Sequence, residues 1–183
     1  MKKIFSIITM LICMICLAGT VDAKMQSNKS SEIAVVIVGT PDYKTNNFIR
    51  YTQEYFKPLN NLKIATGNEV QSKYQTYWLD KGSLDEGTPT KDDFIAFVNY
   101  SGYNKVIYLV IKDPVVDVHD RKSKQRSRAS VTVNAFLVDK TQIAKVSSST
   151  NEEDSNTSEL RAKRGAFKQC VRDISEVLNP MLK

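Results

Sequence analysis

Two apolar runs without polar interruption limit most strongly how this chain can fold. The first, Ile33 to Val38, has the sequence IAVVIV, and the second, Lys105 to Ile111, has the sequence KVIYLVI. Both runs are rich in β-branched residues, and neither alternates between apolar and polar positions. A strand with one face in water alternates, whereas a strand covered on both faces does not. The sequence therefore predicts a sheet whose central strands have helices on both sides.

Three segments between these runs have the features of helices. Apolar residues recur at helical intervals in 45–57 and in 68–80. Thr90 and Asp93 have the spacing of a capping box, so we expect a third helix to begin there and to end at Gly102. Each of the three is long enough to cover part of the sheet.

The clearest helix lies at the end of the chain. Its apolar stripe comprises Leu160, Phe167, Cys170, Val171, Ile174, Val177 and Leu178. We expect Asn156 and Glu159 to cap its start and Pro180 to end it. Because Cys170 lies within the stripe, it is predicted to be a buried core residue rather than a reactive thiol.

The other strands are shorter or alternate. Residues 62–65 form a short candidate strand, and 115–119 can extend. Residues 129–138 alternate, with Ala, Val and Leu on one face, and 143–147 are expected to pair back with them as a hairpin. The segment 147–158 is acidic, rich in Ser, Thr and Asn, and is predicted to be a loop.

The predicted elements follow the order β-α-β-α-α-β-β-β-α. This order indicates an α/β (α+β) fold in a single domain over residues 32–183, with a mixed sheet of about five strands and helices packed on it. Residues 24–31 are polar and lack periodicity, so they are expected to be a tether.

Residues 1–23 have the features of a secretory signal peptide. Lys2 and Lys3 precede an apolar run that ends in small residues suited to cleavage after Ala23. The run is shorter than the ~20 apolar residues that a membrane span requires. Cys13 and Cys16 raise the alternative of lipidation, but isoleucine precedes each of them where lipid attachment favours a small residue. The chain is therefore expected to be exported, to the periplasm or beyond the cell.

One segment concentrates positive charge in a chain whose net charge is +6. Five of the eight residues in 121–128 are basic, namely Arg121, Lys122, Lys124, Arg126 and Arg128. The segment joins two candidate strands and is expected to be an exposed hairpin connection. Two interpretations stay open: a solvated loop that blunts a sheet edge, or a contact with an acidic protein, lipid headgroups or cell-wall polymer. Nucleic acid is not an expected partner of an exported protein with this modest charge.

The sequence contains no pattern that identifies an enzyme. The single histidine, His119, shares a strand face with Asp117, but no third ligand with metal-site spacing accompanies them. A nucleophile elbow and a glycine-rich phosphate loop are both absent, although Gly39-Thr40-Pro41 follows a buried strand where such a loop would lie. We therefore expect no catalytic residues, no metal and no cofactor.

Three aromatic residues lie close together in 68–80. Tyr74, Tyr77 and Trp78 share one helical face. They could form a stacking surface for a sugar or a partner, or they could be the half-buried side of a helix.

Three stretches together resemble a known family. They are the buried strand IAVVIV, the strand entry Gly102-Tyr103-Asn104-Lys105-Val106-Ile107, and the hairpin turn Leu137-Val138-Asp139-Lys140-Thr141. With the terminal amphipathic helix, they resemble the periplasmic α/β domain shared by curli-secretion-channel lipoproteins, penicillin-binding-protein activator lipoproteins and the TolB amino-terminal domain. The resemblance implies a bacterial, non-enzymatic envelope domain that binds proteins or assembles, and it supplies no catalytic residues.

Three functions follow as expectations. The first is an exported cell-envelope protein that acts as a protein-binding or assembly module. The second is a binder of anionic envelope polymer or lipid headgroups through residues 121–128. The third is a hydrolase or metalloenzyme without a recognisable motif. The sequence identifies neither the partner nor the oligomeric state.

Overall fold

The computed structural model describes residues 32–182, except 58–61, 84–87, 113 and 122–123. The helices and strands, in chain order, are β1 (Glu32–Val38), η2 (Pro41–Lys44), α2 (Asn46–Tyr55), β2 (Lys63–Ala65), α3 (Asn68–Asp80), α4 (Lys91–Ser101), β3 (Lys105–Ile111), β4 (Val115–Arg121), β5 (Lys124–Asp139), β6 (Ile143–Ser155), α5 (Glu159–Leu178) and η3 (Asn179–Leu182). The predicted signal peptide (1–23) and tether (24–31) lie outside the described residues. Among the described residues, no helix combines the length and the apolar character needed to cross a bilayer.

The six strands form one mixed sheet in the order β2-β1-β3-β5-β4, and β6 pairs with β5. β1 is parallel to both β2 and β3, whereas β3, β4 and β6 are all antiparallel to β5. The predicted α/β class and mixed sheet are confirmed. The sheet has six strands instead of about five, because the candidate segment 115–119 is a regular strand, β4, which runs to residue 121.

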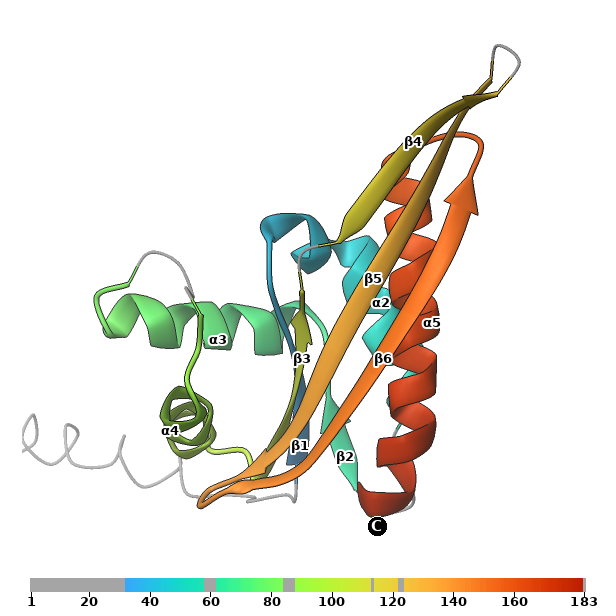
Figure 1. Ribbon diagram of the computed structural model, residues 1–183. Helices are drawn as coiled ribbons and strands as arrows, with labels where there is room; N and C mark the ends of the chain where they lie inside the picture. The colour runs from blue at the N-terminus through green and yellow to red at the C-terminus, as the bar shows by residue number, and fades with distance from the viewer. Residues whose placement is uncertain (1–31, 58–61, 84–87, 113, 122–123, 183) are drawn as a thin grey trace, which may run out of the picture. The chain divides into compact units, whose positions relative to one another are not determined.

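Helices cover both faces of the sheet around β1 and β3, as the unbroken apolar runs predicted (Figure 1). On one face, Ile33, Val35 and Ile37 of β1 pack with residues of α2 and α5. On the other face, Ala34, Val36 and Val38 pack with α3 and α4. Each central strand therefore contributes to two separate hydrophobic cores.

β5 is long enough to lie in two different surroundings. The half from Val133 to Asp139 pairs with β3, and the half from Lys124 to Ser130 pairs with β4. β6 runs along the opposite side of β5, from Ser127 to Val138. Around β4 and the upper parts of β5 and β6, only α5 packs on the sheet (Figure 1). The other face of this half has no described helix over it.

The acidic segment predicted as a loop is a strand. β6 continues from Ile143 to Ser155 and pairs with β5 along this length. Its inward residues include Ser149 and Asn151, which are polar, so the apolar alternation that reveals a half-buried strand is missing. These inward residues instead form hydrogen bonds with polar residues of α5.

The last helix differs from its prediction in its N-terminal cap and in two residues of its apolar stripe. Ser158 caps α5 by accepting a hydrogen bond from Arg161 N at 3.2 Å, in place of the expected Asn156. Leu160 and Val177 are 49% and 47% exposed, because the covered arc of the helix is narrower than the stripe. Cys170 is fully buried, which confirms its predicted place in the core.

Candidate functional site

The basic segment is a two-stranded ribbon and not a loop. Residues 121 and 124–128 belong to β4 and β5, and only 122–123 lie between the strands, outside the described residues. The sequence did not reveal these strands, because a strand is recognised by alternating apolar and polar residues and this stretch contains few apolar ones. The pairing places Arg121 opposite Lys124, and positions 117 and 119 opposite Arg128 and Arg126. Four of the five basic positions, 121, 124, 126 and 128, therefore share one face of the ribbon.

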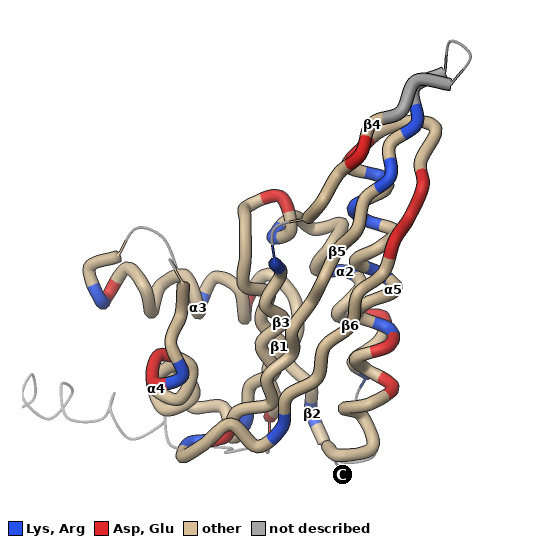
Figure 2. Tube along the Cα trace, in the orientation of Figure 1, with Lys and Arg blue, Asp and Glu red and all other residues tan. Residues whose placement is uncertain are grey.

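Part of this positive charge is neutralised at the base of the ribbon. Arg128 donates from Nε to Oδ1 of Asp154 at 2.8 Å and from Nη2 to Oδ2 at 3.2 Å. Asp117 lies opposite Arg128 on β4, and Glu152 lies opposite Ser130 on β6. Figure 2 shows these acidic stretches beside the basic ones at the same end of β5. The charge of Arg128 is therefore balanced locally by Asp154.

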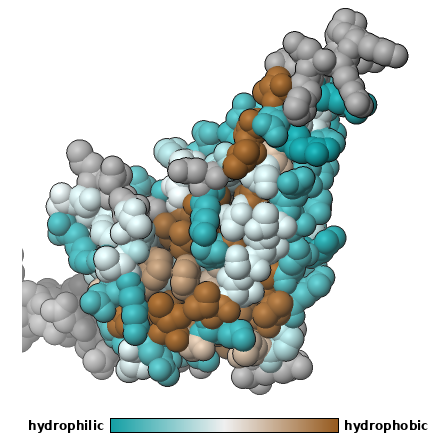
Figure 3. Space-filling model, viewed as in Figure 1, coloured by the Kyte–Doolittle hydropathy of each residue, from teal (hydrophilic) through white to brown (hydrophobic). Residues whose placement is uncertain are grey.

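Below the ribbon, the open face of β5 and β6 carries small polar side chains. The hydroxyls of Thr132 and Thr150 are 2.9 Å apart, and Ser148 Oγ donates to Asn134 Oδ1 at 2.8 Å. Figure 3 shows this region as mostly pale, with brown atoms lower down and along β4. Val115 on β4 is 65% exposed. This half of the sheet thus presents a flat polar surface bordered by exposed apolar residues.

One hydrogen bond fixes the direction of the backbone groups in this part of β5. Lys112 N donates to Thr132 O at 3.0 Å, so the backbone groups of Thr132 point away from β6. In an antiparallel pair, neighbouring residues point their N–H and C=O groups to opposite sides. The backbone groups of Val131 and Val133 therefore point toward β6.

The same alternation identifies the backbone groups at the outer edge of β6. Asn151 and Ser149 lie opposite Val131 and Val133, so their N–H and C=O groups face β5. Those of Ser148, Thr150 and Glu152 then point outward. Among the described strands, β6 pairs only with β5. Its outer edge is a row of backbone donors and acceptors that no described strand uses.

The inward face of β6 meets α5 through a polar cluster. Asp173 Oδ2 accepts hydrogen bonds from Asn151 Nδ2 at 2.8 Å and from Ser149 Oγ at 3.0 Å. The bond from Asn151 is the main reason that the pKa of Asp173 lies below its usual range. Cys170 beside the cluster donates to Val131 O at 3.3 Å. Burial raises the pKa of the Cys170 thiol, so this cysteine lacks the thiolate that a nucleophile needs.

The described residues contain no group of three or more His, Cys, Asp or Glu side chains placed to hold a metal ion. Of the two interpretations of the aromatic residues in α3, the stacking surface is wrong for Tyr74 and Tyr77, which belong to the covered side of the helix. Tyr74 and Tyr77 are buried and pack edge-on against Phe97, because α4 covers this side of α3. Trp78 is only half-buried and lies beside a pocket.

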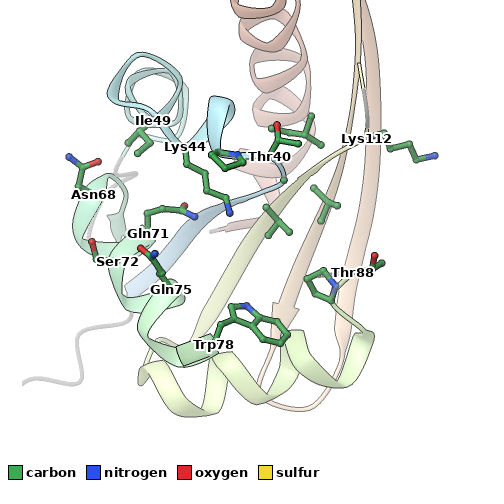
Figure 4. Close-up of a pocket in the computed structure, with 16 residues that line it drawn as sticks. Thr40, Lys44, Ile49, Asn68, Gln71, Ser72, Gln75, Trp78, Thr88 and Lys112 are labelled. Atoms are coloured by element: carbon green, nitrogen blue, oxygen red, sulfur yellow. The ribbon is translucent and has the colours of Figure 1, made fainter. Parts of the chain in front are cut away.

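This pocket has a volume of about 920 Å³ and lies at the carboxyl ends of β1 and β3 (Figure 4). Its apolar floor includes Val38, Val110 and Ile111. η2 contributes Lys44 on one side, and α3 contributes Gln75 and Trp78 on another. The loop that begins at Gly39, which lacks the glycine-rich phosphate-loop pattern, borders the pocket.

Two local features position the end of β1 beside the pocket. Gly39 has a φ of 151°, and a Cβ there would lie 3.3 Å from Cβ of Ile111, so glycine lets the end of β1 pass close to β3. Gln71 on α3 donates from Nε2 to Ile37 O at 2.8 Å and accepts from Ile37 N at 3.1 Å. Its side-chain amide replaces a neighbouring strand where β2 has already ended, and it fixes α3 against β1.

No protein-family model and no curated protein matches this sequence. Solved structures that resemble the chain include lipoprotein GNA1162 from Neisseria meningitidis, with 16% identity and a TM-score of 0.42 over 82% of this chain and 97% of that chain. Others are the hypothetical protein CT253 from Chlamydia trachomatis (13% identity, TM-score 0.40, covering 84% and 98%) and a minor lipoprotein from Acinetobacter baumannii (9%, 0.35, covering 84% and 92%). Two of these three are bacterial lipoproteins. Similarity at these scores carries no conclusion about function, which we therefore argue from the chain's own geometry.

Proposed function

We propose that the chain is an exported, non-enzymatic module of the bacterial envelope that binds another protein. The outer edge of β6 carries this proposal. β6 has 13 residues, and backbone groups at Ser148, Thr150 and Glu152 point away from β5. An open edge of this length is a template on which an extended segment of a partner can add a strand.

The basic ribbon supports the proposal by its position. Arg121, Lys122, Lys124, Arg126 and Arg128 belong to the segment that adjoins the acidic end of β6. Positive charge beside an open strand edge would steer a partner with an acidic surface and fix its direction along β6.

The edge is tested by blocking one outward N–H. Thr150→Pro removes the outward N–H of Thr150 and leaves the ladder to β5 intact, because proline is tolerated on edge strands. Thr150→Val is the matched control, because it also removes the hydroxyl but keeps the N–H. The full chain is expressed with its export signal, cross-linked in the envelope and purified, and the recovered partner is quantified.

We expect wild type and Thr150→Val to recover the same protein in a fixed ratio, and Thr150→Pro to lose it. Circular dichroism and thermal unfolding of each variant establish that the sheet persists. Equal recovery by Thr150→Pro, or the absence of any stoichiometric partner of wild type, would contradict the proposal.

One observation favours a second candidate, which is binding to an anionic polymer or to lipid headgroups. Basic positions 121, 124, 126 and 128 share one face of the ribbon. Near an anionic membrane, each such residue contributes about 1 kcal/mol, so several together give measurable binding.

The second candidate is tested by replacing all five basic residues with Gln and measuring binding to vesicles with and without anionic lipid. It requires binding by wild type that falls steeply with salt, because screening shortens to about 8 Å at physiological ionic strength. It also requires loss of binding in the variant. Salt-independent binding, or binding that the variant retains, excludes it.

A further inference from the structure

We infer that Asn156, in the connection between β6 and α5, is the acceptor site of an N-linked glycan. The inference rests on the export that the proposed function assumes, but not on the edge of β6. The sequence supplies the acceptor motif, and the structure distinguishes this copy of the motif from another.

The motif for N-linked glycosylation, Asn-X-Ser/Thr with X other than proline, occurs three times in the sequence. The three copies begin at Asn28, Asn99 and Asn156. Asn28 lies outside the described residues. The structure therefore allows a comparison of Asn99 with Asn156.

An acidic residue precedes only one of these two copies. Glycosyl transferases of the bacterial envelope prefer such a residue two positions before the acceptor. Asp154 occupies this position for Asn156, whereas Phe97 occupies it for Asn99. Asp154 pairs with Arg128 at 2.8 Å, but both side chains are 53% exposed, and an ion pair in water contributes little to stability. A transferase can therefore reach the carboxylate.

The side-chain amide of Asn156 is accessible as well. The residue is exposed and lies at a bend between the end of β6 and the start of α5 (Figure 1). The sequence predicted that Asn156 caps α5, but Ser158 has that role. Within the described part of the chain, the side chain of Asn156 forms no hydrogen bond. A glycan on its amide nitrogen would therefore displace no described contact.

The hydroxyl groups around Asn156 already hold the connection in place. Ser155 is buried, and its Oγ accepts from the backbone N–H groups of Thr157 and Ser158 at 3.2 Å and 3.3 Å. Ser158 Oγ in turn accepts from Arg161 N at 3.2 Å. A glycan on Asn156 leaves all of these bonds intact, so the folded connection tolerates the modification.

Asn99 lacks this freedom. It lies inside α4, where its Nδ2 donates to Ile95 O at 3.0 Å and to Lys140 O at 3.1 Å. A glycosylated amide nitrogen keeps one hydrogen and could not keep both bonds. Ser101, the third residue of this copy, is buried, and its Oγ donates to a backbone carbonyl of the same helix at 3.2 Å. We therefore expect modification of Asn156 and not of Asn99.

The transfer forms one bond and breaks another. The side-chain nitrogen of Asn156 bonds to C1 of the first sugar of a lipid-diphosphate-linked oligosaccharide, and the C1–O bond to the diphosphate breaks. The lipid diphosphate leaves with the electron pair of that bond. The amide nitrogen loses one proton to a base of the transferase, and nothing is oxidised or reduced.

The test uses the full chain, isolated from the envelope fraction of the bacterium that makes it. Its tryptic peptides are analysed by mass spectrometry, with fragmentation that keeps sugars attached to their side chains. Peptide 146–161 contains Asn156, and peptide 92–105 contains Asn99. We expect the first peptide to carry sugar on Asn156 and the second to be unmodified.

Two substitutions at Ser158 separate the glycosylation motif from the helix cap. Aspartate is also a favourable N-cap, so Ser158→Asp keeps the cap of α5 but removes the hydroxyl that the motif requires. Ser158→Thr, the matched control, keeps both. The glycan should persist in Ser158→Thr and disappear in Ser158→Asp and in Asn156→Gln. Thermal unfolding checks that each variant folds.

Three results would overturn the inference: an unmodified peptide 146–161, sugar on a hydroxyl group of this peptide instead of on Asn156, or sugar on Asn99. A glycan that persists in Ser158→Asp would overturn it as well. An exported but unmodified chain contradicts this inference alone, whereas a chain absent from the envelope also contradicts the proposed function. Thr150→Pro should leave the glycan in place, so failure here is distinct from failure at the β6 edge.

Discussion

The two halves of β5 show how a change of surroundings alters one strand. At Phe136 and Val138, the face opposite α5 is covered by the second core, and these positions are aromatic or aliphatic. At Ser130 and Thr132, the same face of the same strand has no described helix over it, and the residues are small and polar. The covered half provides stability, and the uncovered half provides exposed surface, which we propose is used for binding.

The comparison is tested most severely by placing a charge in each half of the molecule. Cys170→Asp buries an unpaired carboxylate beneath α5, so we expect it to destabilise the fold by more than about 4 kcal/mol. Thr132→Asp on the open face should cost about 1 kcal/mol or less. Urea unfolding measures both free energies.

In native wild type, a thiol reagent should leave Cys170 unmodified until denaturant is added, and rapid native labelling would contradict its burial.

Substitutions that remove apolar volume should also destabilise the covered half more than the uncovered half, but by a smaller difference in the free energy of unfolding. Phe97 is fully buried among Tyr74, Tyr77 and Tyr108, so Phe97→Ala should cost about 3–5 kcal/mol. Val115, opposite Ser130 in the uncovered half of the sheet, is 65% exposed, and Val115→Ala should change the stability by less than about 0.5 kcal/mol. Thermal unfolding of the two variants measures the difference. Similar effects would mean that the second half is covered as well.

A double-mutant cycle tests how closely α5 packs against β6 at Gly165 and Glu153. A Cβ on Gly165 would lie 2.5 Å from Cγ of Glu153, so Gly165→Ala should cost about 1–2 kcal/mol despite the higher helix propensity of alanine. Glu153→Ala removes the clash together with the hydrogen bond from Gln169. In the Glu153→Ala background, Gly165→Ala should become neutral or stabilising. If Gly165→Ala destabilises both backgrounds equally, the strain does not arise from contact with Glu153.

The smallest effect concerns the capping box of α4. Asp93 accepts from Thr90 and pairs with Lys81 at 2.7 Å, and these contacts lower its pKa to about 2. The pKa in the unfolded chain is higher, about 3.9. The carboxylate therefore stabilises the fold above about pH 4, and this contribution is lost as the pH falls toward 2.

Asp93→Ala should lower the stability by about 1 kcal/mol at pH 7. The difference between wild type and variant should shrink between pH 4 and pH 2. Urea unfolding at several pH values measures it, and a difference independent of pH would contradict the assigned role of the carboxylate.

The sequence revealed the elements whose residues alternate or cluster by polarity. The run from Ile33 to Val38, the capping box at Thr90 and Asp93, and the buried Cys170 are all confirmed. Apolar patterning alone identifies a covered strand or helix, so these elements were predictable.

The elements of the uncovered half were not predictable in the same way. The inward face of β6 meets polar groups of α5, such as Asp173, and so its strand period is not marked by apolar residues. The basic ribbon was mistaken for a loop for the same reason. The walls of the pocket come from four separate segments, and only the glycine at position 39, after a buried strand, indicated its place.

The central claim is that β6 has an open edge in the isolated chain, and residue-resolved amide hydrogen exchange tests it directly. Ser149 and Asn151, whose N–H groups face β5, should exchange slowly, and Ser148, Thr150 and Glu152 should exchange rapidly. When the partner is bound, the second set should become protected while the first remains so. Uniform protection along β6 in the isolated chain, or no added protection of the second set on binding, would contradict the claim.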